Sequence, residues 1–364
     1  MSGRRGARRP PFCPNPDCDS HTNPGTWRYK KKGFHRRARG PRRVQRYVCH
    51  HCGRNFSSQT FSPTYWLKRN DLPRSVFHRI LCCSGLRQIA REFGVAHSTI
   101  QRQANRLGRH CLLLHEALRP RGAPSERLVL DGLRTFEHSQ YWPYDLNVLV
   151  GISHFVYGFN DAELRRSGSM RPGQQRKRAA LESRCGRPHA QATRDAVQEL
   201  VERCVPVGAS VEIHTDEHRA YPAALGRVAN RAIAQRTTSS RAPRTARNPL
   251  FAANLADLLL RHDHANHKRE TIAFSKRRQG ALYRMAIWLV WRNYMKSVSE
   301  NRRDEPPAVG LGQIPKRLTV LDVLAQRRFP WRYELTGWLE RCYFARIPTR
   351  RLARCREHAL RFAC

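Results

Sequence analysis

Two short apolar runs, each ending in an aspartate, place the strongest constraint on the fold of this chain. The first is LVLD at residues 128–131, and the second is VEIHTD at residues 211–216. Both have the length and composition of strands that enter a hydrophobic core and bring one carboxylate to the strand end or near it. Two carboxylates on adjacent strands repel each other unless a cation lies between them. Because Mg²⁺ is a hard cation that prefers oxygen ligands, the pattern predicts a site for Mg²⁺, or for Mn²⁺, at Asp131 and Asp216.

The charge of the chain indicates the kind of partner that it binds. Among 364 residues, 68 are Lys or Arg and 28 are Asp or Glu, which gives a formal net charge of +40. Such an excess repels itself and favours a polyanionic partner, so we expect nucleic acid, with an anionic membrane surface as the alternative. The sequence has no apolar run of about 18 residues or more, and its basic N-terminus lacks the apolar segment of a secretory signal. We therefore expect no membrane-spanning helix, a cytoplasmic location, and two or three domains.

Four of the 12 cysteines have the spacing of metal ligands. They form two pairs, CPNPDC and CHHC, joined by an insert of hairpin length. This arrangement predicts a zinc ribbon over residues 11–62, in which Zn²⁺ replaces the hydrophobic core that so short a segment lacks. The first pair is wider than the usual CxxC, which leaves three histidines open as substitute ligands. The expected ligands are Cys13, Cys18, Cys49 and Cys52, and the substitutes are His21, His50 and His51.

The insert between the two cysteine pairs is basic and carries three aromatic residues, Trp27, Tyr29 and Phe34. This mixture favours contact with phosphates together with stacking on bases. The alternative is a basic face that is only solvated. Residues 1–10, which precede the ribbon, are expected to form a disordered basic arm.

Residues 72–118 have the spacing of a helix-turn-helix. Ala90 is small where two helices would cross, and Gly94 can adopt the positive φ of the turn. Ile100 is spaced to pack back onto the first helix. The alternative is an ordinary helical hairpin within a larger core.

The second helix of this unit is expected to begin at HST, with His97 or Ser98 near the cap position. Its exposed side carries residue types that read base edges or hold phosphates. These are His97, Thr99, Gln101, Arg102 and Asn105. The following residues 119–126, RPRGAPSE, are expected to form a linker.

The order of elements over residues 127–300 indicates the fold class. We expect three strands, a helix, a strand, a short helix, a weaker strand and two long helices. The expected strands are 127–137, 146–151, 155–159, 211–215 and 227–235; the helices are 189–205, 221–225, 248–262 and 276–299; a charged loop covers 165–188. This order is that of the ribonuclease-H-like fold, an α/β core in which helices flank a mixed sheet.

The chain resembles the DDE transposases of bacterial insertion sequences, specifically those that begin with a zinc ribbon and a helix-turn-helix. The matching segments run over about residues 13–299 in the family's order: CPNPDC, YVCHHCGRNFS, LRQIAREFGVAHSTIQR, LVLDG, HTDEHRAYP and FSKRRQGALYRMAIWLVWRNYMKS. The resemblance implies a magnesium-dependent recombinase that cuts element ends and joins the freed 3′-hydroxyls to target DNA. It also implies a homo-oligomer on double-stranded DNA, associated with a prokaryotic nucleoid. Asp131 and Asp216 match the first two acids of the family.

The third acid of the family departs from the pattern. The family has a glutamate near the start of the helix after the last strand, and this chain has none there. Asp257 follows Asn254 at the spacing of the family's NxxE pair, and both share a helical face with Arg261. Leu258 and its leucine neighbours are expected to face the core. We favour Asp257 as the third ligand, with Glu270 as the alternative.

Basic residues follow the candidate third acid and are expected to grip phosphates, with plain solvation as the alternative. They are Lys268, Arg269, Lys276, Arg277, Arg278 and Arg284. The basic C-terminal region, residues 301–364, is expected to contact either DNA or a second protomer, and the sequence does not choose between them. Two other functions stay open beside the transposase. One is a non-catalytic, sequence-specific DNA-binding protein on a decayed core, and the other is a metal-dependent nuclease that cuts without joining.

Overall fold

The computed structural model describes residues 9–37, 43–268, 271–299, 301 and 305–352. Nearly all of the expected N-terminal arm therefore lies outside the described residues. Within the described part of the chain, no helix is both long enough and apolar enough to cross a membrane.

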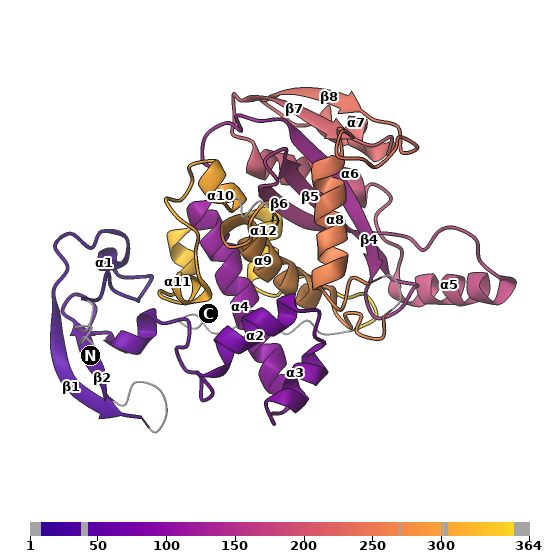
Figure 1. Ribbon diagram of the computed structural model, residues 1–364. Coiled ribbons are helices and arrows are strands. Elements are labelled where there is room, and N and C mark those ends of the chain that lie inside the picture. Colours follow the sequence, from indigo (N-terminus) through magenta and orange to yellow (C-terminus); the bar gives the residue numbers. More distant parts are fainter. Residues whose placement is uncertain (1–8, 38–42, 269–270, 300, 302–304, 353–364) are drawn as a thin grey trace.

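The N-terminal segment folds around a small three-stranded antiparallel sheet (Figure 1). Its strands are β1 (Tyr29–Arg36), β2 (Arg43–Cys49) and β3 (Asn55–Ser57), in that order, with a short α1 (Asp19–Thr22) before them and a 3-10 turn η1 (Ser58–Phe61) after them. The core of this segment consists of cysteines and stacked aromatic rings. Trp27 is buried in that core, so the expectation that it stacks on bases is wrong, whereas Tyr29 is half-buried and packs against the core. Phe34 is half exposed and lies against Arg43.

Three helices follow: α2 (Leu72–Leu81), α3 (Leu86–Glu92) and α4 (His97–Leu118). Gly94 has a φ of +56° in the turn between α3 and α4, as the turn requires. Ile89 and Ile100 are both fully buried where these helices meet. The cap of α4 is Ala96 rather than His97 or Ser98, and its side chain has no oxygen to satisfy the first turn.

Five strands form a mixed sheet in the order β6-β5-β4-β7-β8. They are β4 (Leu128–Phe136), β5 (Pro143–Gly151), β6 (Val156–Glu163), β7 (Ser210–Thr215) and β8 (Ala232–Thr237). β4, β5 and β6 are antiparallel, whereas β7 and β8 run parallel to β4. Nearly every residue of β5 is buried, which explains why its sequence is apolar on both faces. The mixed sheet with flanking helices is confirmed.

Helices cover both faces of this sheet (Figure 1). α6 (Ala192–Cys204) packs against β5 and β6, and Figure 1 shows α8 (Phe251–Asp263) on the other side, against β4 and β5. A short α7 (Ala220–Leu225) follows β7, and the nearly buried α9 (Arg278–Tyr294) packs along α4. Residues 165–188 are not only a loop, because α5 (Pro172–Cys185) forms there and projects from the body of the protein. Its residues favour a helix, but they do not form an apolar face. The sequence of this segment therefore lacks the periodic apolar pattern by which a helix is predicted.

One hydrophobic core joins helices α2–α4 to the sheet, so the helix-turn-helix is packed onto the body of the protein. Gly108 marks the closest approach of α4 and α9: a Cβ there would lie 2.7 Å from the Cα of Tyr283. Leu258 on α8 is 64% exposed, which contradicts its expected place in the core. The expected division of the chain into domains stays a prediction.

The C-terminal region packs on the rest of the protein through α10 (Pro307–Gly310), α11 (Val320–Val323), the 3-10 turn η2 (Pro330–Arg332) and α12 (Gly337–Tyr343). It also reaches the N-terminal segment. The guanidinium of Arg327 donates to the carbonyl of Thr60 at 3.1 Å, and the Phe329 and Phe12 rings are 5.1 Å apart. The described part of this region therefore connects the small sheet to the core.

Candidate functional site

The four N-terminal cysteines form a compact group of sulfur atoms. The Sγ atoms of Cys13, Cys18, Cys49 and Cys52 all lie within 4.8 Å of one another. The Cys13–Cys52 and Cys18–Cys49 sulfur distances are 3.6 Å and 4.0 Å. A tetrahedral zinc ion with Zn–S bonds of about 2.3 Å separates its sulfur ligands by about 3.8 Å, so the group fits such an ion. These cysteines can hold a metal ion such as zinc.

Neighbouring groups contact this cysteine group, and none of the substitute histidines, His21, His50 and His51, belongs to it. The indole N–H of Trp27 points to the Cys49 sulfur at 3.2 Å. Burial acts to raise the pKa of Cys49, but hydrogen bonds from the Cys52 backbone, from Trp27 and from the His51 backbone lower it to about 7. The Nδ1 atoms of His21 and His51 are 2.8 Å and 3.0 Å from the Cys13 carbonyl and the Ser20 hydroxyl.

Strand register brings the first two candidate acids level with each other. β4 and β7 pair in parallel through Leu128–Ile213 and Val129–His214. Continuing this offset by two residues puts Asp131 opposite Asp216, which directly follows the last residue of β7. Both carboxylates therefore lie where the two strands separate, at the carboxyl end of β7.

The electrostatics show that the third candidate, Asp257 on α8, belongs to the same neighbourhood. Burial raises the pKa of Asp131, and the charge on Asp216 raises it further, against a 2.7 Å hydrogen bond from the Gly132 N–H. Burial likewise raises the pKa of Asp257 to about 8, and the charge on Asp131 contributes. Arg244 opposes both rises, so its guanidinium also lies near these acids.

The three carboxylates do not form a group of ligand atoms that all lie within 4.8 Å of one another. Among the described residues, only the cysteine group has three or more ligand atoms within 4.8 Å of one another. Three carboxylates supply the hard oxygen donors that Mg²⁺ or Mn²⁺ prefers, so the donor set fits such an ion.

Two further groups lie at these acids. Burial raises the pKa of Tyr221, and the charges of four carboxylates, those of Asp131, Asp216, Asp145 and Asp257, raise it further. Asp145 on β5 forms an ion pair with Arg134 at 3.1 Å. Asp145 is a polar residue on an apolar strand, a sequence signal for a site that was missed. Arg244 follows β8 in a loop with no comparable signal.

The residues after Asp216 have structural partners. The Asp216 carboxylate accepts a hydrogen bond from the backbone N–H of His218 at 2.9 Å. Glu217 accepts from the backbone N–H of Ser240 at 3.0 Å and so connects the end of β7 to the segment after β8. These contacts fix the loop that carries Asp216.

The structure separates the expected phosphate-binding residues into exposed and interior groups. Arg284 lies inside, where it donates to Asn266 at 2.7 Å and to Ser275, so its expected phosphate contact is corrected. Arg278 is also buried, against Asp161 and other acids. Those with exposed side chains are His97, Arg102, Lys268, Lys276 and Arg277; Thr99, Gln101 and Asn105 are half-buried; Arg269 and Glu270 lie outside the described residues.

Comparisons with known proteins add little to this picture. Neither a protein-family model nor a curated protein matches the chain. Among solved structures, the chain is similar to one in the "CryoEM structure of simian T-cell lymphotropic virus intasome in complex with PP2A regulatory subunit B56 gamma", with 14% sequence identity over 63% of this chain and 68% of that chain. The TM-score of 0.24 is too low to identify the fold.

Proposed function

We propose that this chain is a DNA transposase with a ribonuclease-H-like core, which binds the ends of a mobile element and carries out cleavage and strand transfer with divalent metal ions. The observation that supports this proposal best is the register of β4 and β7, which brings Asp131 level with Asp216. Asp257 supplies a third carboxylate from α8 whose ionisation depends on the charge of Asp131. Adjacent strands and one helix thus contribute three acids to one neighbourhood.

In this proposal Asp131, Asp216 and Asp257 hold two Mg²⁺ ions. Such a pair, when bound, activates a water or a 3′-hydroxyl and stabilises the leaving oxygen during in-line displacement of a phosphodiester. The protein contributes orientation, because backbone N–H groups of Gly132 and His218 hold one oxygen each of Asp131 and Asp216.

Positive charge at the site has a separate role. Arg244 is near enough to lower the pKa values of Asp131 and Asp257. A guanidinium beside Asp131 and Asp257 would attract a phosphate to acids that would otherwise repel it. Arg244 would therefore position the scissile phosphate.

Exposed residues on α4 and the large positive charge support the DNA-binding part of the proposal. His97 and Arg102 face solvent at the first turns of the second helix of the helix-turn-helix, where such proteins read the major groove. The net charge of +40 favours duplex DNA as the partner. We propose a homo-oligomer on DNA, since two element ends are processed together.

A second function is supported by the distances between the acids. Three carboxylates that do not all lie within 4.8 Å of one another, with Asp257 in place of a longer Glu, are also expected of a decayed site. The chain would then be a non-catalytic, sequence-specific DNA-binding protein that keeps the ribbon and the helix-turn-helix.

Purified protein, Mg²⁺ and linear DNA carrying the two ends of the encoding element distinguish these functions. Cleavage with joining supports the transposase, cleavage alone supports a nuclease, and binding alone supports the non-catalytic protein. Asp131→Asn and Asp216→Asn should each reduce both products below detection while DNA binding persists. Asp195→Asn is the control, because that exposed side chain pairs with Arg194 on the surface of α6. Full activity of the Asp131 variant would reject the proposed site.

A further inference from the structure

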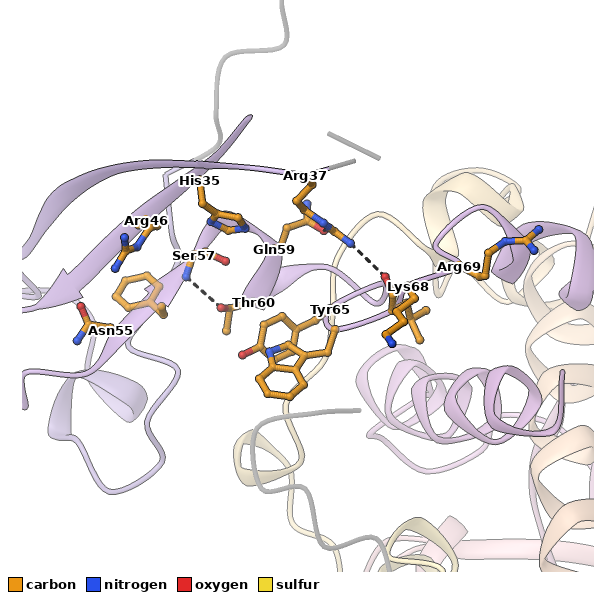
Figure 2. Close-up of a pocket in the computed structure, with 13 residues that line it drawn as sticks. His35, Arg37, Arg46, Asn55, Ser57, Gln59, Thr60, Tyr65, Lys68 and Arg69 are labelled. Atoms are coloured by element: carbon orange, nitrogen blue, oxygen red, sulfur yellow. Dashed lines mark hydrogen bonds between the residues drawn. The ribbon is translucent and has the colours of Figure 1, made fainter. Parts of the chain in front are cut away.

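A cavity of about 720 Å³ lies between the small sheet and the segment that leads to α2 (Figure 2). Residues of β1, β2, β3 and η1 form one wall, and residues 65–69 form the other. Its volume is in the range of cavities that hold ligands. The four cysteine ligands do not line this cavity, and neither do the three candidate catalytic acids.

The lining of the cavity is cationic. It includes His35, Arg37, Arg46, Lys68 and Arg69, and none of the described residues that line it is acidic. Arg69 pairs with nearby Asp71 at 2.7 Å, whereas the side chains of Arg46 and Lys68 are exposed to solvent. This excess of positive charge in the lining favours an anionic ligand.

Arg37 fixes the two walls relative to each other. Its guanidinium donates to the side chain of Gln59 at 3.0 Å on the ribbon side and to the carbonyl of Leu67 at 3.1 Å on the other side. Figure 2 shows Arg37 beside Gln59. The cavity is thus a preformed feature, which lowers the entropy that a ligand loses on binding.

Trp66 lies in this cavity with 76% of its surface exposed. Its φ of +62° is a conformation that a bulky side chain adopts at a free-energy cost. The surrounding turn is held firmly, because buried Arg106 of α4 donates to the carbonyls of Pro63 and Tyr65, the first at 3.0 Å. A large apolar ring held outward beside cations is suited to stacking on a nucleobase.

We propose that this cavity binds an unpaired DNA strand, with one base stacked on Trp66 and the flanking phosphates on Arg46 and Lys68. In a duplex, the base faces are already stacked on one another, so the exposed indole favours a single strand. The proposal rests on the cavity itself and goes beyond the duplex binding and strand transfer proposed above.

Fluorescence anisotropy with a short labelled oligothymidylate tests this inference on the full-length, zinc-loaded protein. Trp66→Ala should weaken binding by at least about fivefold, the lower limit for loss of one base–aromatic stack, without changing the salt dependence. Trp66→Phe should keep most of the affinity. Lys68→Ala should reduce the slope of log K against log salt by about 0.7, the value for one phosphate contact with a single strand. The matched control is Trp331→Ala, since Trp331 is 45% exposed and does not line the cavity.

The inference is overturned if the wild-type protein does not bind the oligonucleotide, or if Trp66→Ala binds it as tightly as the wild type. It is also overturned if the Trp66 variant loses affinity only for blunt duplex, since the cavity would then contact paired DNA. Asp131→Asn should bind the single strand as the wild type does. Failure of the catalytic proposal is therefore distinguishable from failure of this one. Zinc content and thermal unfolding verify that each variant is folded.

Discussion

Asp257→Asn should make the metal-free protein more stable, by an amount that grows with pH. The substitution keeps the shape of the side chain and removes its ability to ionise. Burial and the charge on Asp131 raise the pKa of Asp257 from 3.8 to about 8 in the folded protein. Between these two values the folded state holds a proton that the unfolded state has released. Stability supported by that proton is present at low pH and is lost as the pH rises towards 8.

The size of the effect follows from the proton difference. One proton changes the unfolding free energy by about 1.4 kcal/mol per pH unit, so the advantage of the variant should increase by at most about 2.7 kcal/mol between pH 5 and pH 7. Partial exposure of Asp257 screens its charge and makes this value an upper limit. Above pH 8 the difference should become constant.

Urea unfolding of both proteins at several pH values measures this difference. The buffer is free of Mg²⁺ but contains no chelator, because a chelator would remove zinc from the cysteine group. Added Mg²⁺ should stabilise the wild type more at pH 8 than at pH 6, since the ion binds the ionised carboxylate, and should have little effect on the variant. An advantage that stays the same from pH 5 to pH 8 would refute the argument that Asp257 is an acid held in an unfavourable environment.

Three other substitutions test separate parts of the structure. Cys52→Ala removes one of four sulfur ligands, so the purified protein should lose its stoichiometric zinc, as measured by metal analysis. Gly108→Ala should lower the unfolding free energy by about 1–3 kcal/mol, because α4 must move away from Tyr283, whereas Gly173→Ala meets only open space on α5 and should not destabilise. Arg278→Met removes the buried cation that pairs with Asp161 and Glu163 and should cost about 3–5 kcal/mol in urea unfolding; an effect near zero would mean that these acids are neutral.

Local sequence patterns were sufficient for four strands of the mixed sheet and for the cysteine group, whereas the strand expected at 227–235 is found at β8 (Ala232–Thr237). Residues 211–215 were expected as a strand and lie within β7 (Ser210–Thr215), because an apolar run of this length between turn residues has few other conformations. The positive φ of Gly94 was also predictable, since glycine adopts it without steric cost. The two cysteine pairs were predictable as one group because the insert between them has hairpin length, and the pairing of β1 with β2 brings the pairs together.

Contacts between distant parts of the chain could not be predicted in this way. Arg284 was expected at the surface because it is charged. It is buried instead, and its guanidinium donates hydrogen bonds to Asn266 and Ser275. Leu258 has the signal of a core residue and is exposed, because α8 buries its smaller alanine face instead. The residue type indicates which hydrogen bonds or apolar contacts a side chain prefers, whereas the tertiary structure determines which neighbours provide them.

The candidate site shows the same limit. Asp131 and Asp216 stood out because each ends an apolar run, and the register of two strands brings them level. Arg244 lies in a segment rich in Ser, Arg and Pro, where nothing distinguishes it from many other arginines of this basic chain. Its position near Asp131 and Asp257 depends on how the segment after β8 folds back towards the sheet, which is a property of the tertiary structure.

The single helix α4 has a mechanical consequence. It runs without interruption for 22 residues, about 33 Å, from the exposed His97 to the part that packs against α9. No hinge lies along it, so a double helix gripped at its first turn would be held at a constant offset from the acids of the sheet. Under the proposed function, the distance between the bases that the protein reads and the bond that it cuts is therefore fixed. Inserting or deleting base pairs between them should abolish cleavage.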